Sequence, residues 1–139
     1  MDRYKILGKV NLTTPNTSLL YTVPLPTIFE NTDVGPRTDA TVLYTIVSSI
    51  IISNQLTTNS HFSIAVLEDS SVVTPVAADY IFKSILLEGW VTMIVSPGIT
   101  LPAIPQGADL LSGAAIWVKC ESGDVTVQAY GVEVTQWKV

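Results

Sequence analysis

The apolar residues of this chain recur with the period of a β-strand and not with the spacing of a helix. Phe62, Ile64 and Val66 alternate with smaller or more polar neighbours, and His61 is expected to point away from the Phe62 face. No window keeps apolar residues at helical spacing with a capping residue ahead of it. Short runs rich in Val, Ile, Thr, Tyr and Phe are separated by Pro, Gly, Asn, Asp and Ser. The pattern predicts an all-β chain.

About eight runs of this kind are expected to be strands. They are Tyr4–Leu12, Ser18–Val23, Thr41–Ser53, the segment around Phe62 to Val66, Tyr80–Leu87, Trp90–Val95, Leu110–Glu121 and Asp124–Trp137. The length of 139 residues fits a single domain covering residues 1–139. We therefore expect one antiparallel β-sandwich, jelly-roll-like in topology.

Three details of these runs bear on the packing of the strands. The run Thr41–Ser53 is apolar on both faces, so it is expected to be covered by protein on both sides or to press against a subunit. The turn Ser122–Asp124 predicts a tight hairpin between the last two strands. In the final strand, apolar residues change parity after Ala129, which predicts a β-bulge at Tyr130–Gly131 that turns later residues, such as Val132, to the other face.

Two segments rich in Pro and Gly, Pro24–Ala40 and Pro97–Ala108, are expected to be irregular, because proline cannot pair within a central strand. Long ordered loops tend to be functional. Apolar residues in such loops gain little from contact with water, so a partner surface would bury them. The interface residues predicted on this basis are Ile28, Phe29, Ile99, Leu101 and Ile104.

The tryptophans allow two interpretations. Trp117 has the opposite parity to Val118 and is expected to point outward, where interfaces are enriched in aromatic anchors. It therefore joins the predicted interface residues. The alternative is an aromatic platform for sugar rings formed by Trp90, Trp117 and Trp137, although core packing is the default expectation for Trp90.

The composition favours a protein whose surface is covered by neighbours. Charged residues make up 14% of the chain, against about 25% in typical domains, and neutral polar residues take their place. Interface cores are depleted in charge, so a homo-oligomer is expected. The net charge is −5 and the basic residues are scattered, which argues against nucleic-acid binding.

Neither secretion nor membrane insertion is expected from the sequence. No continuous apolar segment follows Met1–Lys5, so the chain lacks the pattern of a signal peptide and is expected to be made in the cytoplasm. The uncharged stretch Ala40–Ser60 is interrupted throughout by Thr, Ser, Asn and Gln, whereas a membrane span needs about 20 predominantly apolar residues.

The residues that could carry chemistry are few. Cys120 is the single cysteine and is expected to be a buried hydrophobe, while His61 is the single histidine and is expected at the surface or in an interface. Glu68, Asp69 and Asp79 match no calcium loop and are expected to be solvated. There is no catalytic triad, phosphate cradle or zinc spacing. We expect a protein that is not an enzyme and that holds no cofactor or metal.

A series of short motifs runs in order through nearly the whole chain: Ser18–Pro24, Val47–Asn54, Phe62–Val66, Tyr80–Ile81, Gly98–Leu101, Gly123–Val127 and Gly131–Thr135. In this order they resemble a family of small virion structural proteins of tailed bacteriophages. The chain differs from the usual pattern by a longer loop after Pro24 and by the segment Pro102–Ala108. The resemblance implies a β-sandwich virion component and supplies no catalytic residues.

The function expected at this point is that of a non-enzymatic bacteriophage virion structural protein. It would be a capsid decoration protein or a subunit associated with the neck, tail or fibre, made in the host cytoplasm and located in the virion. Its partners would be other virion proteins and further copies of itself, without nucleic acid or membrane. The alternative is a receptor-directed carbohydrate-binding module of the virion.

Overall fold

The computed structural model describes residues 4–13, 17–24, 40–67, 75–102, 113–121 and 123–137. These residues form strands, as the sequence predicted, and one short 3₁₀ helix. The elements are β1 (Tyr4–Leu12), β2 (Ser18–Thr22), β3 (Ala40–Asn54), β4 (Ser60–Leu67), η1 (Ala77–Asp79), β5 (Tyr80–Leu87), β6 (Thr92–Val95), β7 (Ile99–Pro102), β8 (Ala115–Cys120) and β9 (Val125–Trp137).

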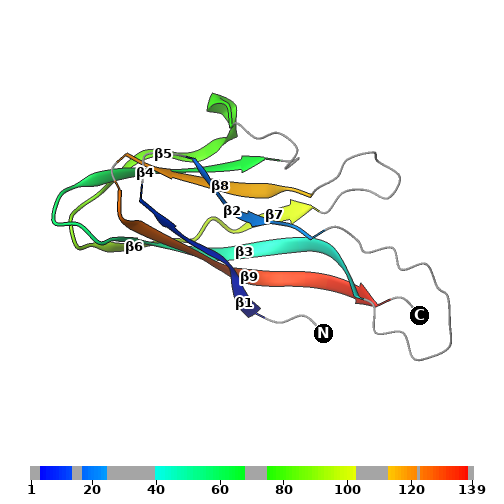
Figure 1. Cartoon of the computed structure of the whole chain (residues 1–139). Helices are drawn as coiled ribbons and strands as arrows, with labels where there is room; N and C mark the ends of the chain where they lie inside the picture. Colours follow the sequence, from blue (N-terminus) through cyan, green and yellow to red (C-terminus); the bar gives the residue numbers. More distant parts are fainter. Residues whose placement is uncertain are drawn as a thin grey trace.

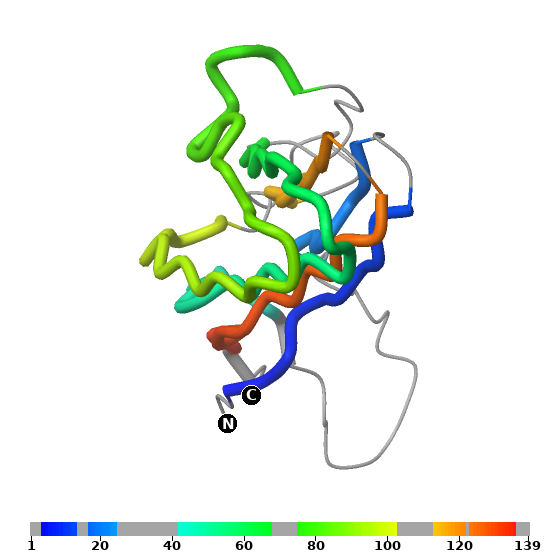
Figure 2. The backbone as a smooth tube through the Cα atoms, turned by 90° about the vertical axis from the view of Figure 1, so that its left-hand side faces the viewer, coloured from blue at the N-terminus to red at the C-terminus, as the bar shows by residue number. Residues whose placement is uncertain are grey.

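The strands form two antiparallel sheets that face each other, and Figures 1 and 2 show these two layers from the side and from one end. Sheet A is five-stranded and has the order β1-β9-β3-β6, with β7 also paired to β3. Sheet B is four-stranded and has the order β2-β8-β4-β5. Successive strands cross from one sheet to the other except from β4 to β5 and from β6 to β7. This wrapping confirms the predicted antiparallel sandwich of jelly-roll type.

The core lies between the two sheets and is filled by alternate residues of their strands. Its largest fully buried side chains are Phe62, Ile50, Ile52, Ile64, Leu87, Leu101 and Ile116. His61 lies on the opposite face of β4 from Phe62, as the alternation predicted. The buried, alternating side chains therefore determine which face of each strand remains on the outside.

Strand β7 corrects the expectation that the chain after Pro97 is irregular. β3 is 15 residues long, so its edge accommodates β6 next to Ile50–Ser53 and β7 next to Tyr44–Val47. Gly98, at a φ of 58°, makes the break between the two short strands. The interface prediction is wrong for Leu101, which is only 1% exposed and belongs to the core, and Ile99 packs partly buried against the core. Ile28, Phe29 and Ile104 lie outside the described residues.

The turn at Gly123–Asp124 does not close the predicted hairpin. β8 belongs to sheet B and β9 to sheet A, so the two strands do not pair, and the turn carries the chain across the sandwich. The backbone of Asp124 donates to the carbonyl of Leu12 at 2.6 Å and accepts from the amide of Gln55 at 2.9 Å. The short turn is thus held by neighbouring turns and not by a ladder between β8 and β9.

The predicted bulge in β9 is also wrong. Val125, Val127 and Ala129 are buried, and Gly131 and Glu133 continue the same inward parity. The register shifts lie in the partner strands instead, in β1 between residues 6 and 8 and in β3 between residues 42 and 44 and between residues 47 and 49. Because the inward residues at this end are a glycine and a glutamate, the apolar pattern breaks while the backbone alternation continues.

Trp90 is 67% exposed, which corrects the expectation that it packs in the core. It lies in the turn between β5 and β6 with a φ of 62°, a left-handed conformation that a bulky residue rarely adopts. The turn is held by Asn54, which is 1% exposed and whose side-chain amide donates to the carbonyls of Thr58 and Leu87. The backbone conformation of this turn therefore directs the indole of Trp90 away from the core.

Candidate functional site

The outer face of sheet A carries an apolar surface. Its side chains come from the four adjacent columns of the sheet, which are β1, β9, β3 and the pair β6 and β7. The apolar residues of this sheet A outer face are Tyr4, Ile6, Tyr130, Val132, Val134, Tyr44, Ile46, Ile51 and Ile94, and polar side chains, among them Lys9, Gln128, Thr126, Ser53 and Thr92, lie on the same face. Ile6 is 51% exposed, Ile46 39% and Ile94 64%, so the face is open to a partner.

The aromatic edge of this face is ordered by local contacts. The rings of Tyr4 and Tyr130 stack with their centroids 6.3 Å apart. The hydroxyl of Ser48 donates to the Tyr4 hydroxyl oxygen at 3.1 Å, and hydrogen bonds from Ser48 and Ser49 lower the pKa of Tyr4. The face therefore has defined aromatic anchors, which interfaces favour.

The sheet A outer face is almost free of charge. Lys9 on β1 is the one charged side chain that points outward from this sheet within the described strands. Lys5 and Glu133 pair with each other at the end of the sandwich, and Glu133 is only 8% exposed. Beside them, the Tyr21 hydroxyl lies 2.8 Å from Thr45 Oγ1, and burial raises the pKa of Tyr21. The polar groups at this end of the sandwich thus pair with one another, as Lys5 does with Glu133 and Tyr21 with Thr45.

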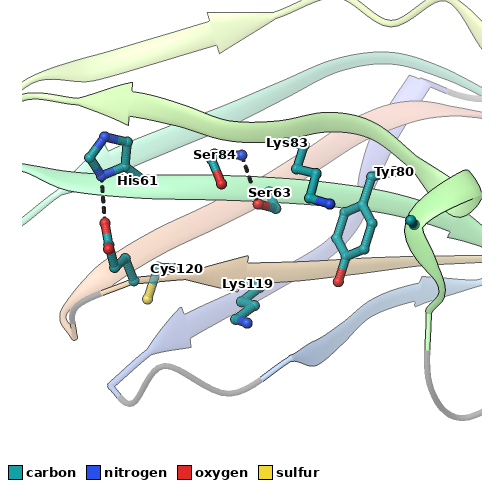
Figure 3. Close-up of a pocket in the computed structure, with 9 residues that line it drawn as sticks. His61, Ser63, Tyr80, Lys83, Ser84, Lys119 and Cys120 are labelled. Atoms are coloured by element: carbon teal, nitrogen blue, oxygen red, sulfur yellow. Dashed lines mark hydrogen bonds and ion pairs between the residues drawn. The ribbon is translucent and has the colours of Figure 1, made fainter.

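The outer face of sheet B contains a pocket of about 480 Å³, shown in Figure 3. Strands β4, β5 and β8 build it, and η1 borders it. Its polar lining consists of His61, Ser63, Tyr80, Lys83, Ser84, Lys119 and Glu121. We call this the sheet B pocket. Its volume falls within the range of small-molecule sites, about 300 to 1,000 Å³.

The centre of the sheet B pocket is a row of side chains across three strands. Ser63 on β4 lies opposite Lys119 on β8, and on its other side it faces a bulge formed by Lys83 and Ser84 on β5. The amide of Ser84 donates to Ser63 Oγ at 3.0 Å, and Ser84 has a φ of 52°. Lys83 Nζ lies 5.8 Å from the centre of the Tyr80 ring, beside which Figure 3 shows it.

The other end of the sheet B pocket holds a hydrogen-bonded pair of side chains. His61 Nδ1 lies 2.5 Å from a carboxylate oxygen of Glu121, and both side chains are exposed to solvent. The backbone amide of Glu121 also donates to the carbonyl of His61 at 2.8 Å. The pocket therefore combines cationic, hydroxyl, aromatic and carboxylate groups on one outer face.

Trp117 lies on the outer side of sheet B, opposite Leu19 and Ala65, in agreement with its predicted parity. It is partly buried, and its indole Nε1 is buried without a hydrogen-bond partner among the residues described. Trp90 lies in a turn next to Leu56, at the other end of β4 from Ala65. These two tryptophans are thus too far apart for the aromatic platform considered above.

The described residues with nucleophilic or metal-binding side chains form no further cluster. Cys120 is 1% exposed, as predicted, and burial raises the pKa of its thiol. Within the described ranges, no group of three or more His, Cys, Asp or Glu residues could hold a metal ion. The same part of the chain contains no helix long and apolar enough to cross a membrane. Glu68 and Asp69 are not described, and Asp79 accepts from the amide of Val76 at 2.7 Å.

Sequence reasoning missed the residues that make up the two surfaces, although one signal was present. The run Thr41–Ser53 is apolar on both faces, and its outward half supplies Ile46 and Ile51 to the sheet A outer face. No comparable signal linked Lys83 to Lys119, because 35 residues of sequence separate these two strand positions.

The chain matches no protein family, and no curated protein or solved structure matches it. Its architecture does not specify an activity by itself, because jelly-roll sandwiches occur in viral capsid proteins, lectins and cupins. The function therefore has to be inferred from the surfaces of the sandwich.

Proposed function

We propose that this protein is a non-enzymatic structural subunit of a bacteriophage virion and that it works by self-association through the sheet A outer face. The observation that carries the proposal is the set of exposed apolar side chains, among them Ile6, Ile46 and Ile94, on that almost uncharged face. The virion setting is supported by the resemblance of the ordered strand motifs to small virion proteins of tailed bacteriophages. The position would be capsid decoration, or the neck, tail or fibre region.

The size of the face supports a stable contact. Strands lie about 4.8 Å apart and rise about 3.3 Å per residue, so the four columns together, polar positions included, cover roughly 700 Å². The two longest strands of the sheet, β3 and β9, have 15 and 13 residues. Standard protein interfaces bury about 800 Å² on each partner. The face is therefore about as large as one half of such an interface.

The charge distribution favours a second copy of this chain as the partner. Two copies of a protein with a net charge of −5 repel each other unless their carboxylates stay away from the contact. None of the described carboxylates lies on the sheet A outer face. A charged partner surface would lose its solvation there without gaining a counter-charge. Two identical apolar faces can meet around a two-fold axis without this cost.

The self-association is tested by placing a charge on the face. We expect Ile46→Lys and Ile94→Lys to weaken association by at least about 30-fold each, because an ammonium would be buried without a partner. The matched control is Ile81→Lys on β5, since Ile81 is 42% exposed, close to the 39% of Ile46, but belongs to sheet B. Sedimentation equilibrium or light scattering after size-exclusion chromatography measures the oligomeric state.

Self-association and the virion role are tested by separate experiments. Association that is lost in the two sheet A variants and kept in Ile81→Lys supports the proposal. A wild-type protein that stays monomeric at high micromolar concentration contradicts self-association. The virion role is tested by quantifying the protein against the major capsid protein in purified particles, where a structural subunit should be present at many copies and its absence would reject the role.

A further inference from the structure

The sheet B pocket concentrates positive charge in an acidic protein. Lys83 and Lys119 both line it. Neither forms an ion pair with a carboxylate among the residues described, whereas Lys5, at the end of the sandwich, is paired with Glu133. Two ammonium groups against one carboxylate, that of Glu121, leave the pocket with excess positive charge and favour a ligand with negative charge.

The groups between the two lysines are arranged to donate hydrogen bonds. Ser63 lies opposite Lys119 on the neighbouring strand and next to the bulge that contains Lys83. Since Ser63 Oγ accepts from the amide of Ser84, its own hydroxyl hydrogen is able to donate outward. Ammonium and hydroxyl donors on a single row suit the two oxygens of a carboxylate.

The ends of the sheet B pocket have a different chemistry. Tyr80 offers an aromatic ring at one end, and Glu121, paired with His61, offers carboxylate oxygens at the other. A carboxylate accepts hydrogen bonds from hydroxyl groups, whereas it repels a doubly charged phosphate. The lining thus fits a polyhydroxylated ring that carries one negative charge better than it fits a bare phosphate.

The backbone of β5 is distorted where it borders the pocket. Neighbouring residues of a regular strand point to opposite faces, yet Lys83 and Ser84 both line the sheet B pocket. The bulge makes this possible, with Ser84 held at a φ of 52°. Bulges are common next to functional sites because they redirect side chains, and a strained non-glycine residue at such a place suggests a functional constraint.

We propose that the sheet B pocket binds a carboxylate-bearing sugar residue of an acidic polysaccharide. Lys83 and Lys119 hold the carboxylate, Ser63 adds a hydrogen bond to it, and Glu121 accepts from ring hydroxyls. This binding goes beyond self-association and uses the opposite sheet, so each copy in an assembly keeps its pocket open. Several linked pockets would then bind one polysaccharide chain with increased avidity.

The probes are short oligosaccharides of three kinds, containing glucuronic acid, galacturonic acid or sialic acid, each tested with its carboxyl-reduced neutral form. Isothermal titration calorimetry on the full-length protein is expected to show binding of at least one acidic oligosaccharide and little binding of its reduced form. Lys83→Gln and Lys119→Gln should each weaken binding by about tenfold or more, which is the usual effect of losing a charge-assisted hydrogen bond. Lys9→Gln on β1 is the matched control and should bind like the wild type.

Several results would contradict the binding of an acidic sugar in the sheet B pocket. Equal binding of acidic and reduced forms, equal losses in the Lys9→Gln control, or no binding of any acidic probe at millimolar concentration would each overturn the proposal. Displacement of the sugar by inorganic phosphate at lower concentration would instead assign a phosphate site. Thermal unfolding of each variant should match that of the wild type, since the lysines are exposed. The self-association test uses the other sheet, so either proposal can fail without the other.

Discussion

Single residues of this protein adopt backbone conformations that their side chains do not favour. Ser84, Trp90 and Asp124 have positive φ values of 52°, 62° and 71°. Such residues persist only where the surrounding structure determines their conformation. For Trp90 the surroundings are visible, because its amide donates to the carbonyl of Leu56 at 2.9 Å and the adjacent turn is held by the buried Asn54.

The strain at Trp90 gives a prediction about stability. Trp90→Gly should leave the free energy of unfolding unchanged or raise it by up to about 1 kcal/mol, because glycine adopts positive φ without a steric cost. The indole contributes little in the isolated chain, since it is 67% exposed. Trp90→Ala is the control and should be less stable than Trp90→Gly, because it keeps the backbone strain. Urea unfolding followed by circular dichroism measures both, and a clear loss in the glycine variant would mean that the indole packs against the fold.

At the scale of elements, the long strand β3 organises sheet A. It pairs with β9 along its whole length and offers its other edge to β6 and β7 in turn. Pro97 and Gly98 lie in the segment that connects these two short strands, after the end of β6 and before the start of β7. β7 is therefore an integral part of the sandwich despite its length of four residues.

The role of β7 predicts different costs for adjacent substitutions. Leu101→Ala should lower the free energy of unfolding by about 2 to 5 kcal/mol, because it leaves a cavity in the core. Thr100→Ala, on the outward face of the same strand, should change it by no more than about 0.5 kcal/mol. Thermal or chemical unfolding of the two variants makes the comparison. Equal, small effects would show that β7 is a surface loop in solution.

At the scale of the whole molecule, the two outer faces differ in their electrostatics. The sheet A outer face combines apolar and uncharged polar side chains with one lysine, whereas the sheet B pocket gathers two lysines, a histidine and a glutamate. Apolar burial is insensitive to screening, while attraction between exposed charges falls as salt is added. The two proposed contacts should therefore respond differently to ionic strength.

Raising sodium chloride from about 0.05 M to about 0.5 M shortens the screening length from about 14 Å to about 4 Å. Self-association should stay constant or strengthen, because repulsion between two acidic copies is screened. Binding of an acidic oligosaccharide should weaken severalfold over the same range. Sedimentation and calorimetry in the same buffers provide the test, and association that falls with salt would indicate that ion pairs hold the copies together.

Much of the strand structure could be predicted because alternation is a local property. Phe62 faces the core and His61 faces outward simply because successive side chains of a strand point to opposite sides. The same reasoning placed Cys120 in the core and Trp117 on the outer side. It was wrong for β9. Val132 is apolar but lies on the sheet A outer face, so the apolar residues change parity although the alternation of the backbone continues.

The sequence by itself therefore determined the fold class and the face that most strand residues occupy. It did not determine which strands are neighbours, because pairing depends on contacts between residues far apart in the chain. A short turn with glycine can close a hairpin or cross between sheets, and here the crossing turn is held by backbone hydrogen bonds of Asp124 with Leu12 and Gln55, which lie far away in the chain. For the same reason, only the tertiary structure placed Ile51 beside Ile94 on one surface and brought Lys83 and Lys119 to one pocket, since a strand's own pattern carries no information about its neighbours.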